Sequence, residues 1–224
     1  MREGPIDYVS EWVDQSDATC YMQRNTAEVN LGVVASYQAL YERTTEDILC
    51  YFHDDVSCYT PDWDKRVLAE FEDPTVGVVG FGGAKQHGSA DIYKTPYHLQ
   101  QLGRSGYLSN VDDAEVHGQR FEGSTDVAVL DGFALCVRRE LLDKMKGWSR
   151  IQPHVDFFCY DYALCAMAHR LGYRVRVLGL KCHHHGGRTS VVVKDLPITS
   201  QKAYDSSHAW FYKEFRDVIP WRCP

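Results

Sequence analysis

Long apolar runs are what this sequence most clearly lacks. No stretch approaches the roughly 18 to 20 consecutive apolar residues that cross a bilayer, and residues 1–7 have no apolar core of the signal-peptide kind. From these two absences we expect a protein without a transmembrane segment that stays in the cytoplasm.

Basic residues are also scarce. The chain has 24 Lys and Arg against 31 Asp and Glu, which gives a formal net charge of −7. Because binding to a phosphate backbone needs clustered Lys and Arg, we expect no nucleic-acid partner. A small anionic substrate would instead need a metal ion to hold it.

Paired cysteines are the third absence. The chain has eight cysteines but no C-x-x-C pair, which argues against a zinc ribbon. Several lie inside apolar, strand-like runs, so we expect reduced core residues rather than a disulfide scaffold. The eight are Cys20, Cys50, Cys58, Cys136, Cys159, Cys165, Cys182 and Cys223.

What is present is the composition of an ordinary globular protein. The 224 residues are 44% hydrophobic and 25% charged, which is sufficient for one well-buried core. We find no internal repeat and no low-complexity segment. We therefore predict a single domain over residues 1–224, with a core at about 18–190 and a helical tail at about 191–224.

The most informative segment is residues 48–56, Ile-Leu-Cys-Tyr-Phe-His-Asp-Asp-Val. Its apolar half is typical of a strand buried on both faces of a parallel α/β sheet, and Asp54 and Asp55 follow at the carboxyl end. Ligands bind at this edge in open α/β sheets, and carboxylates there suit a hard divalent cation that holds a phosphate. The simpler interpretation is a solvated turn, because Asp is a common turn residue. Thr60 as an N-cap and Pro61 at the first helical position predict a helix directly afterwards.

Apolar spacing predicts alternating helices and strands. A helix at 30–43 leads into a strand at 48–52, and a helix at 61–72 leads into a strand at 76–81, which makes a parallel crossover. This alternation predicts an α/β fold with a mostly parallel sheet flanked by helices. The later predicted elements are a strand at 127–137 with a bend at Asp131-Gly132, a helix at 138–146, a helix at 160–171, a strand at 173–182 and a helix at 203–216, after an irregular stretch at 82–126.

Several short motifs follow one another in a fixed order. They are Asn30-x-Gly32 with Ala35 and Gln38, Phe52-His53-Asp54-Asp55-Val56, Pro61-Asp62-Trp63, Phe71-Glu72-Asp73-Pro74-x-Val76-Gly77, Asp131-Gly132 with Arg138-Arg139-Glu140 and Gly147-Trp148, Tyr160-Asp161-Tyr162-Ala163-Leu164 with Arg170-Leu171-Gly172-Tyr173, and His183-x-His185-Gly186-Gly187. In this order, over about residues 25–190, they resemble the GT-A fold nucleotide-sugar glycosyltransferases, especially the large inverting family that includes cellulose-synthase-like, chitin-synthase-like and bacterial capsule enzymes. The resemblance implies a GT-A-like (Rossmann-like) fold, a nucleoside diphosphate sugar donor, a glycan, lipid or protein hydroxyl acceptor, and Mn²⁺ or Mg²⁺ as cofactor.

The resemblance implies a metal held by Asp55 and a late histidine. Strand alternation puts His183 and His185 on one face and His184 on the other, so we predict Asp55, His183 and His185 as ligands. A solvated strand end is the alternative for this histidine run. The predicted contacts to the nucleotide and its metal are Asn30, Gly32, His53, Asp54, Asp55 and Arg188.

An inverting transferase also needs one carboxylate that removes the acceptor hydroxyl proton. Asp161 matches the family's base position, and Asp156 is the second candidate. The alternative for Asp161 is a charge favoured by the N-terminus of a helix. The predicted substrate contacts are Asp131, Gly132, Trp63 and Trp148, although a Trp near the end of an element more often packs into the core.

Three features depart from the family pattern. His53 stands in place of the first carboxylate of the D-x-D motif, and Tyr160 stands in place of the Glu before the base. The third is the nucleobase-binding half at the N-terminus, which we expect to be missing or reduced to residues 8–17, with residues 18–22 as the next strand.

The pattern as a whole predicts a metal-dependent, inverting glycosyltransferase. The departures keep open a non-catalytic GT-A-like protein that binds a glycan, a partner chain or a second copy of itself. A metal-dependent phosphohydrolase, with a dinuclear centre built from His53, Asp54 and the histidine run, is a third hypothesis. It would need more regularly placed His and Asp ligands than the sequence offers.

Overall fold

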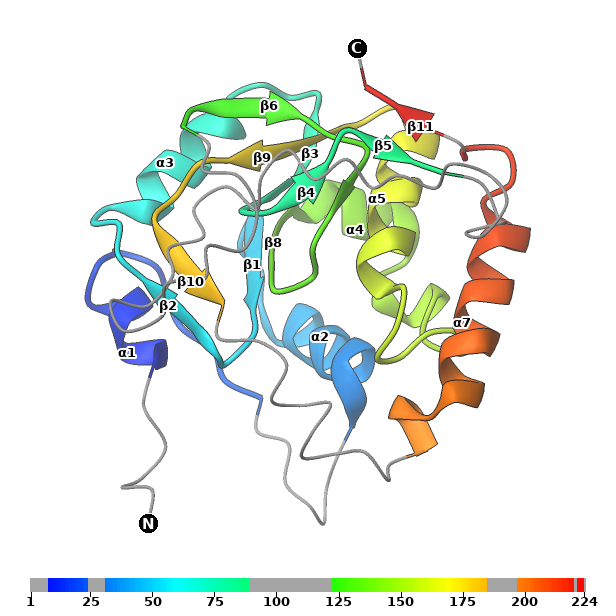
Figure 1. Ribbon diagram of the computed structural model, residues 1–224. Helices are drawn as coiled ribbons and strands as arrows, with labels where there is room; N and C mark the ends of the chain where they lie inside the picture. The colour runs from blue at the N-terminus through cyan, green and yellow to red at the C-terminus, as the bar shows by residue number, and fades with distance from the viewer. Residues whose placement is uncertain (1–7, 24–30, 89–121, 185–196, 220, 224) are drawn as a thin grey trace, which may run out of the picture.

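A central five-stranded sheet with helices on both faces organises the molecule (Figure 1). The alternation of helices and strands predicted from the sequence is present, and the α/β class is confirmed. The computed structural model describes residues 8–23, 31–88, 122–184, 197–219 and 221–223, without the side chains of residues 198 and 222.

The sheet is mixed in strand direction. Its order is β1-β8-β3-β9-β6, and the only neighbouring parallel pair in it is β3 with β9. Strands β1, β3 and β9 run in one direction, while β8 and β6 run in the other. The predicted crossover therefore joins two strands of the same direction, but β8 lies between them. The strands are β1 (Ile48–Phe52), β8 (Ala134–Arg138), β3 (Val76–Gly80), β9 (Arg174–Leu178) and β6 (Ser124–Asp126).

Strand β1 separates two hydrophobic cores. Leu49 and Tyr51 belong to one core, whereas Cys50 and Phe52 pack against the other. This follows from the period of two along a strand, which sends successive side chains to opposite faces. An apolar residue at every position of β1 is therefore required by its place in the fold.

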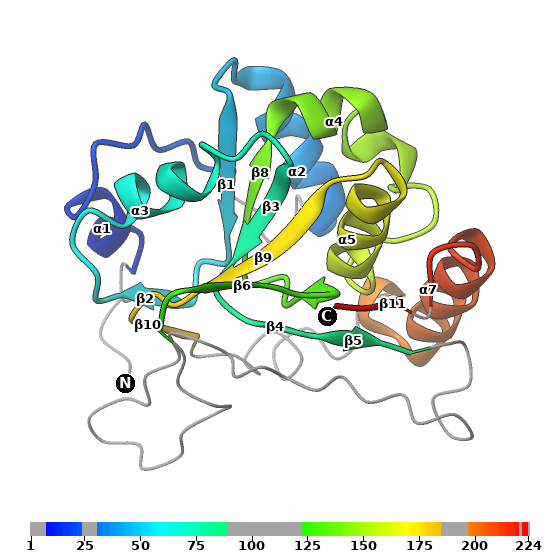
Figure 2. The same cartoon turned by 90° about the horizontal axis from the view of Figure 1, so that it is seen from above.

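Each core is covered by its own set of helices (Figure 2). Helices α2, α4 and α5 cover one face, and α7 packs outside α5 through Phe211 and Phe215. Helices α1 and α3 cover the other face, where Trp12 and Trp63 meet edge to face at 5.2 Å. The helices are α1 (Tyr8–Val13), α2 (Gly32–Arg43), α3 (Trp63–Glu70), α4 (Arg139–Met145), α5 (Tyr160–Arg170) and α7 (Gln201–Glu214), with 3₁₀ turns η1 (Trp148–Arg150) and η2 (Pro197–Thr199).

Three short two-stranded pairs extend the fold beyond the main sheet. The pair of β2 with β10 is the one that matters for the site, because it continues from β1 and β9 at their carboxyl ends. The pairs are β2 (Val56–Cys58) with β10 (Cys182–His184), β4 (Gly83–Ala84) with β7 (Val129–Leu130), and β5 (Gln86–His87) with β11 (Trp221–Arg222).

Two local predictions are wrong. Residues 18–22 are exposed and form no strand. Thr60 does not cap α3, since the cap position is Asp62 with φ 53° and no side-chain cap bond. The Thr60 hydroxyl instead accepts a hydrogen bond from the backbone N–H of Lys181 at 2.8 Å, which fastens the start of α3 to the segment before β10.

The cysteines and helices agree with the compositional expectations. All eight cysteines are free thiols, and all but Cys20 are buried or half-buried. In the described part of the chain, no helix combines the length and apolarity needed to cross a bilayer.

Candidate active site and metal centre

The turn between β1 and β2 holds the first part of the site. His53 continues the strand pairing, because its backbone N–H donates to the carbonyl of Phe133 at 2.9 Å. Asp54 and Asp55 then form the turn. Asp55 and His53 are half-buried whereas Asp54 is exposed, so the two adjacent carboxylates lie in different environments.

Strand β10 brings a histidine to this turn. Because β10 pairs antiparallel with β2, His184 lies opposite Val56, next to the turn. The Nε2 atom of His184 is 3.3 Å from Oδ1 of Asp55, and its ring centre is 5.5 Å from that of His53. One ligand atom from each of His53, Asp55 and His184 lies within 4.8 Å of the others. Two imidazoles and a carboxylate at this spacing fit a single divalent cation.

The histidine that joins the cluster is His184 and not the predicted His183. His183 is buried opposite Ser57 and is not part of the cluster, whereas His184 is. His185 lies outside the described residues. A one-residue shift moves a side chain to the other face of a strand, so this correction matters. The motif H-x-G-G carried the signal, because the histidine two positions before Gly186 is His184.

The surroundings set the ionisation of this cluster. Burial, reinforced by the charge of His184, lowers the pKa of His53, so this imidazole is neutral at pH 7. Burial acts to raise the pKa of Asp55, but the hydrogen bond to His184 and its charge outweigh burial and lower that pKa. A neutral imidazole beside an ionised carboxylate is the protonation state that metal binding requires.

Tyr160, the first residue of α5, contacts the cluster through His53. Its hydroxyl lies 2.7 Å from Nε2 of His53, which is 107 residues earlier in the chain. The same hydroxyl packs on Gly132, where a Cβ would stand only 2.2 Å from it. Burial raises the pKa of Tyr160, so this side chain is a neutral phenol. The two residues that depart from the family motifs, His53 and Tyr160, are thus in direct contact.

Asp161 lies beside Tyr160 at the same edge of the sheet. Its Oδ2 accepts a hydrogen bond from the backbone N–H of Gly132 at 3.1 Å, and its Oδ1 accepts one from Tyr162 at 2.9 Å. Burial, reinforced by the charge of Asp131, raises the pKa of Asp161 to about 7. A carboxyl group that titrates near neutral pH is suited to accept a proton there. The structure therefore brings together the predicted residues Asp131, Gly132 and Asp161.

Asp156, the second candidate for the base, lies at the N-terminus of α2. Its carboxylate interacts with the backbone N–H groups of Val33 and Val34 at the start of α2, while burial keeps its pKa above the ordinary value. Gly32 has φ +77°, and a Cβ there would come within 2.1 Å of Oδ1 of Asp156. The structure thus places Asp156 and Gly32 together at the N-terminus of α2, and Asp156 as a second base and Gly32 as a nucleotide contact stay predictions.

The two tryptophans predicted to contact substrate are core residues. Trp63 is buried, and its indole N–H donates to the carbonyl of Trp12 at 2.8 Å. Trp148 is completely buried and packs edge to face on Tyr37 and Tyr51. Neither ring has a face open to a ligand. The predicted nucleotide contacts Asn30 and Arg188 lie outside the described residues.

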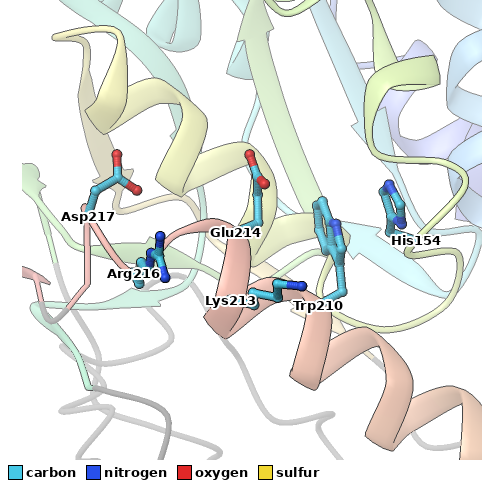
Figure 3. A pocket seen from close by; sticks show the side chains of 6 residues that line it. All are labelled: His154, Trp210, Lys213, Glu214, Arg216 and Asp217. Carbon is cyan, nitrogen blue, oxygen red and sulfur yellow. The ribbon is translucent and has the colours of Figure 1, made fainter.

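A hollow of about 630 Å³ lies along α7, and none of the residues that line it belongs to the cluster of His53, Asp55 and His184 (Figure 3). Trp210 stacks on His154 in it, with ring centres 4.8 Å apart. Arg170 of α5 forms ion pairs with Glu214 and Asp217 at its edge. The hollow is lined by His154, Trp210, Lys213, Glu214, Arg216 and Asp217.

Comparison with known proteins identifies the family. The profile of the glycosyltransferase-like family matches residues 25–215. This range covers most of the chain and includes the cluster of potential metal ligands, Tyr160, Asp161 and the central sheet. The chain therefore belongs to the glycosyltransferase-like family. Its mixed α/β architecture is consistent with a GT-A-like fold.

Two more distant similarities concern only parts of other proteins. A phosphate acyltransferase of Chlamydia caviae is 25% identical over 132 residues, which covers 53% of this chain and 37% of that enzyme. The crystal structure of A197 from STIV aligns with a TM-score of 0.41 at 18% identity, covering 67% of this chain and 63% of that one. The chain thus spans less than two thirds of either protein, and neither similarity transfers an activity to it.

Proposed function

We propose that this protein is a metal-dependent glycosyltransferase that moves a sugar from a nucleoside diphosphate sugar to a hydroxyl acceptor with inversion at the anomeric carbon. The observation that supports this most strongly is the position of Asp161, a carboxyl group with a pKa near 7, beside a cluster with the donor set of a divalent cation. Membership of the glycosyltransferase-like family is consistent with it.

The proposed reaction is a single displacement. The acceptor hydroxyl oxygen forms a bond to the anomeric carbon, and the bond from that carbon to the diphosphate oxygen breaks. The electron pair of the broken bond leaves with the nucleoside diphosphate, and the hydroxyl proton passes to Asp161. Its pKa near 7 lets Asp161 be ionised before the step and hold the proton after it. Catalysis by such a base contributes roughly 10²- to 10⁴-fold.

The metal would be held by His53, Asp55 and His184. When bound, it would neutralise the negative charge that the diphosphate leaving group gathers. Asp131 and Gly132 would contact the acceptor. Both are close to the proposed base, since the Gly132 N–H donates to the Asp161 carboxylate at 3.1 Å and the charge of Asp131 acts on the pKa of Asp161.

A screen of nucleotide sugars tests the proposal. Release of nucleoside diphosphate is followed with Mn²⁺ for the wild type, Asp55→Ala and Asp54→Ala. We expect release by the wild type and by Asp54→Ala, whose side chain is exposed, and at least about a 100-fold loss in Asp55→Ala. Equal release by Asp55→Ala and wild type would remove the metal assignment. Absence of any release, with Mn²⁺-dependent binding of nucleoside diphosphate retained, would favour a binding protein of the same fold.

The phosphohydrolase hypothesis has less support. In the described part of the chain, the only group of three or more potential metal ligands is His53, Asp55 and His184, which suffices for one ion. A dinuclear centre needs further bridging and terminal ligands. Elemental analysis that gives two tightly bound ions for each chain would revive that hypothesis.

A further inference from the structure

We propose that Tyr160 is a positioning residue that fixes the imidazole of His53 through Nε2, and that the resulting site of two imidazoles and one carboxylate selects Mn²⁺ over Mg²⁺. This inference rests on the proposed metal centre. It adds a residue that would not itself contact the metal, and it commits to one class of cation.

The first step is the choice of nitrogen on His53. A neutral imidazole has one N–H and one lone pair. The Tyr160 hydroxyl lies 2.7 Å from Nε2, so with the N–H on Nε2 the lone pair for a cation is on Nδ1. Metal-bound histidines usually donate their second ring N–H in this way, and such a bond fixes both tautomer and ring orientation.

The second step is that the Tyr160 hydroxyl has little freedom to move. The side chain is buried, and its ring meets Tyr37 edge to face at 5.8 Å. The missing side chain at Gly132 creates the space that the hydroxyl fills, since a Cβ there would lie 2.2 Å away. The phenol is therefore held against Nε2 of His53.

The third step concerns His184, which is also held in place. Its ring stacks on Phe133 with centres 5.0 Å apart and planes within 17°, and its Nε2 lies 3.3 Å from the Asp55 carboxylate. Both imidazoles are thus oriented by packing or hydrogen bonding before any cation binds. Preorganised ligands favour a cation that accepts their geometry and donor type.

The donor set then decides the cation. Mg²⁺ binds oxygen ligands and keeps several waters, and imidazole is a poor ligand for it. Imidazole suits transition-metal dications, and Mn²⁺ accepts both carboxylate and imidazole donors. With nitrogen in two of the three protein ligands, we expect Mn²⁺ to bind at least about tenfold more tightly than Mg²⁺.

The test measures cation binding by the metal-free full chain, without nucleotide or turnover. Electron paramagnetic resonance of free Mn²⁺ gives the Kd, and added Mg²⁺ gives its competing affinity. Tyr160→Phe retains the ring and removes the hydroxyl, and should raise the Kd for Mn²⁺ by about 10- to 100-fold. Tyr173→Phe is the matched control, because the Tyr173 hydroxyl interacts with Lys144 at 2.8 Å and with Glu140, and lies outside the cluster.

His53→Asp is a second variant that does not depend on the packing of Tyr160. A second carboxylate in place of one imidazole should narrow the preference for Mn²⁺ over Mg²⁺ by about tenfold. Unchanged Mn²⁺ affinity in Tyr160→Phe, or equal affinities of the wild type for the two cations, would overturn the inference while leaving the proposed metal centre intact. Failure of the wild type to bind either cation would overturn the metal centre as well.

Discussion

Histidine, carboxylate and aromatic side chains gather in two parts of this molecule, at the carboxyl edge of β1 and along the outer face of α7. At the edge, His53, Asp55 and His184 converge in a half-buried cluster. Along α7, Trp210 stacks on His154 (Figure 3). Glu214, at the end of α7, and Asp217 beyond it form ion pairs with Arg170. The kinds of residue are similar, but their electrostatic states differ.

The difference lies in what satisfies each carboxylate. Asp217 is bound to Arg170, and this hydrogen bond lowers its pKa, as expected for a surface ion pair. Asp161 has backbone N–H partners, and in the described part of the chain no ion pair includes it. Burial and Asp131 therefore raise its pKa to about 7. A perturbed carboxyl group next to a cluster of potential ligands points to function more strongly than a hollow whose carboxylates are held in ion pairs with arginine.

The largest expected effect is on turnover in Asp161→Asn. Without a carboxylate to accept the proton, kcat/KM for nucleoside diphosphate release should fall by about 10²- to 10⁴-fold. Asp156→Asn is the matched comparison, since the Asp156 carboxylate interacts with the backbone at the start of α2 and its loss should affect stability more than rate. A greater loss of kcat/KM in Asp156→Asn than in Asp161→Asn would assign the role of the base to Asp156 instead.

The second effect is on stability, in the same Asp161→Asn variant. The folded pKa is raised from 3.8 to about 7, so between these values the unfolded chain loses the proton while the folded chain keeps it. The wild-type free energy of unfolding therefore falls as the pH rises through this range. Above pH 7 the whole destabilisation by the ionised Asp161 carboxylate is present. Relative to wild type, the variant should gain about 2 to 4 kcal/mol in free energy of unfolding between about pH 4 and pH 8.

Urea denaturation of both proteins at several pH values measures this gain. A difference in free energy of unfolding that does not change with pH would show that Asp161 titrates normally, and would weaken its assignment as the base.

The third effect is smaller and concerns Gly132→Ala. The added methyl would meet the Tyr160 hydroxyl at 2.2 Å, and a forced shift of a buried ring costs about 1 to 3 kcal/mol. The His53 contact should weaken with it, so Mn²⁺ affinity should fall as in Tyr160→Phe. Calorimetric melting and Mn²⁺ titration are the measurements.

Gly123→Ala separates strain from site geometry. Its Cβ would meet no atom within 4 Å, although φ is +89°, so it should cost about 1 kcal/mol and leave Mn²⁺ affinity unchanged. Equal affinities in Gly132→Ala and wild type would mean that Tyr160 can move without consequence.

Segments with strong local patterns were predictable from the sequence. The apolar run of β1 and the helical period of α5 each identify an element without further context. The position of β8 between β1 and β3 was not predictable, because strand order depends on pairings between distant segments. The Trp residues at 63 and 148 were assigned to substrate because local sequence does not tell which side of an element an indole faces.

The site was predictable in part for the same reason. Asp55 and Asp161 stand in recognisable motifs. His184 was missed through a one-residue error in register, which reverses the face of a strand. The contact of His53 with Tyr160 joins residues 107 apart and has no local signal. It becomes visible only when the β1–β2 turn, the Gly132 bend and the start of α5 are placed together.

The smallest effect is expected along α7, in Arg170→Met. The change removes ion pairs with Glu214 and Asp217 but keeps an apolar chain over Phe215, on whose ring the guanidinium now lies at 4.6 Å. Because Glu214 and Asp217 are partly exposed, solvent screening limits the loss to about 1 kcal/mol or less. Urea denaturation at low salt measures this loss, and 1 M NaCl should shrink the difference between variant and wild type.

Turnover and Mn²⁺ affinity should stay at wild-type values in Arg170→Met, because these ion pairs serve to join α5 to α7 and the residues after it. A fall in turnover or in Mn²⁺ affinity would show that α7 is coupled to the cluster of His53, Asp55 and His184. The region along α7 could then no longer be regarded as purely structural.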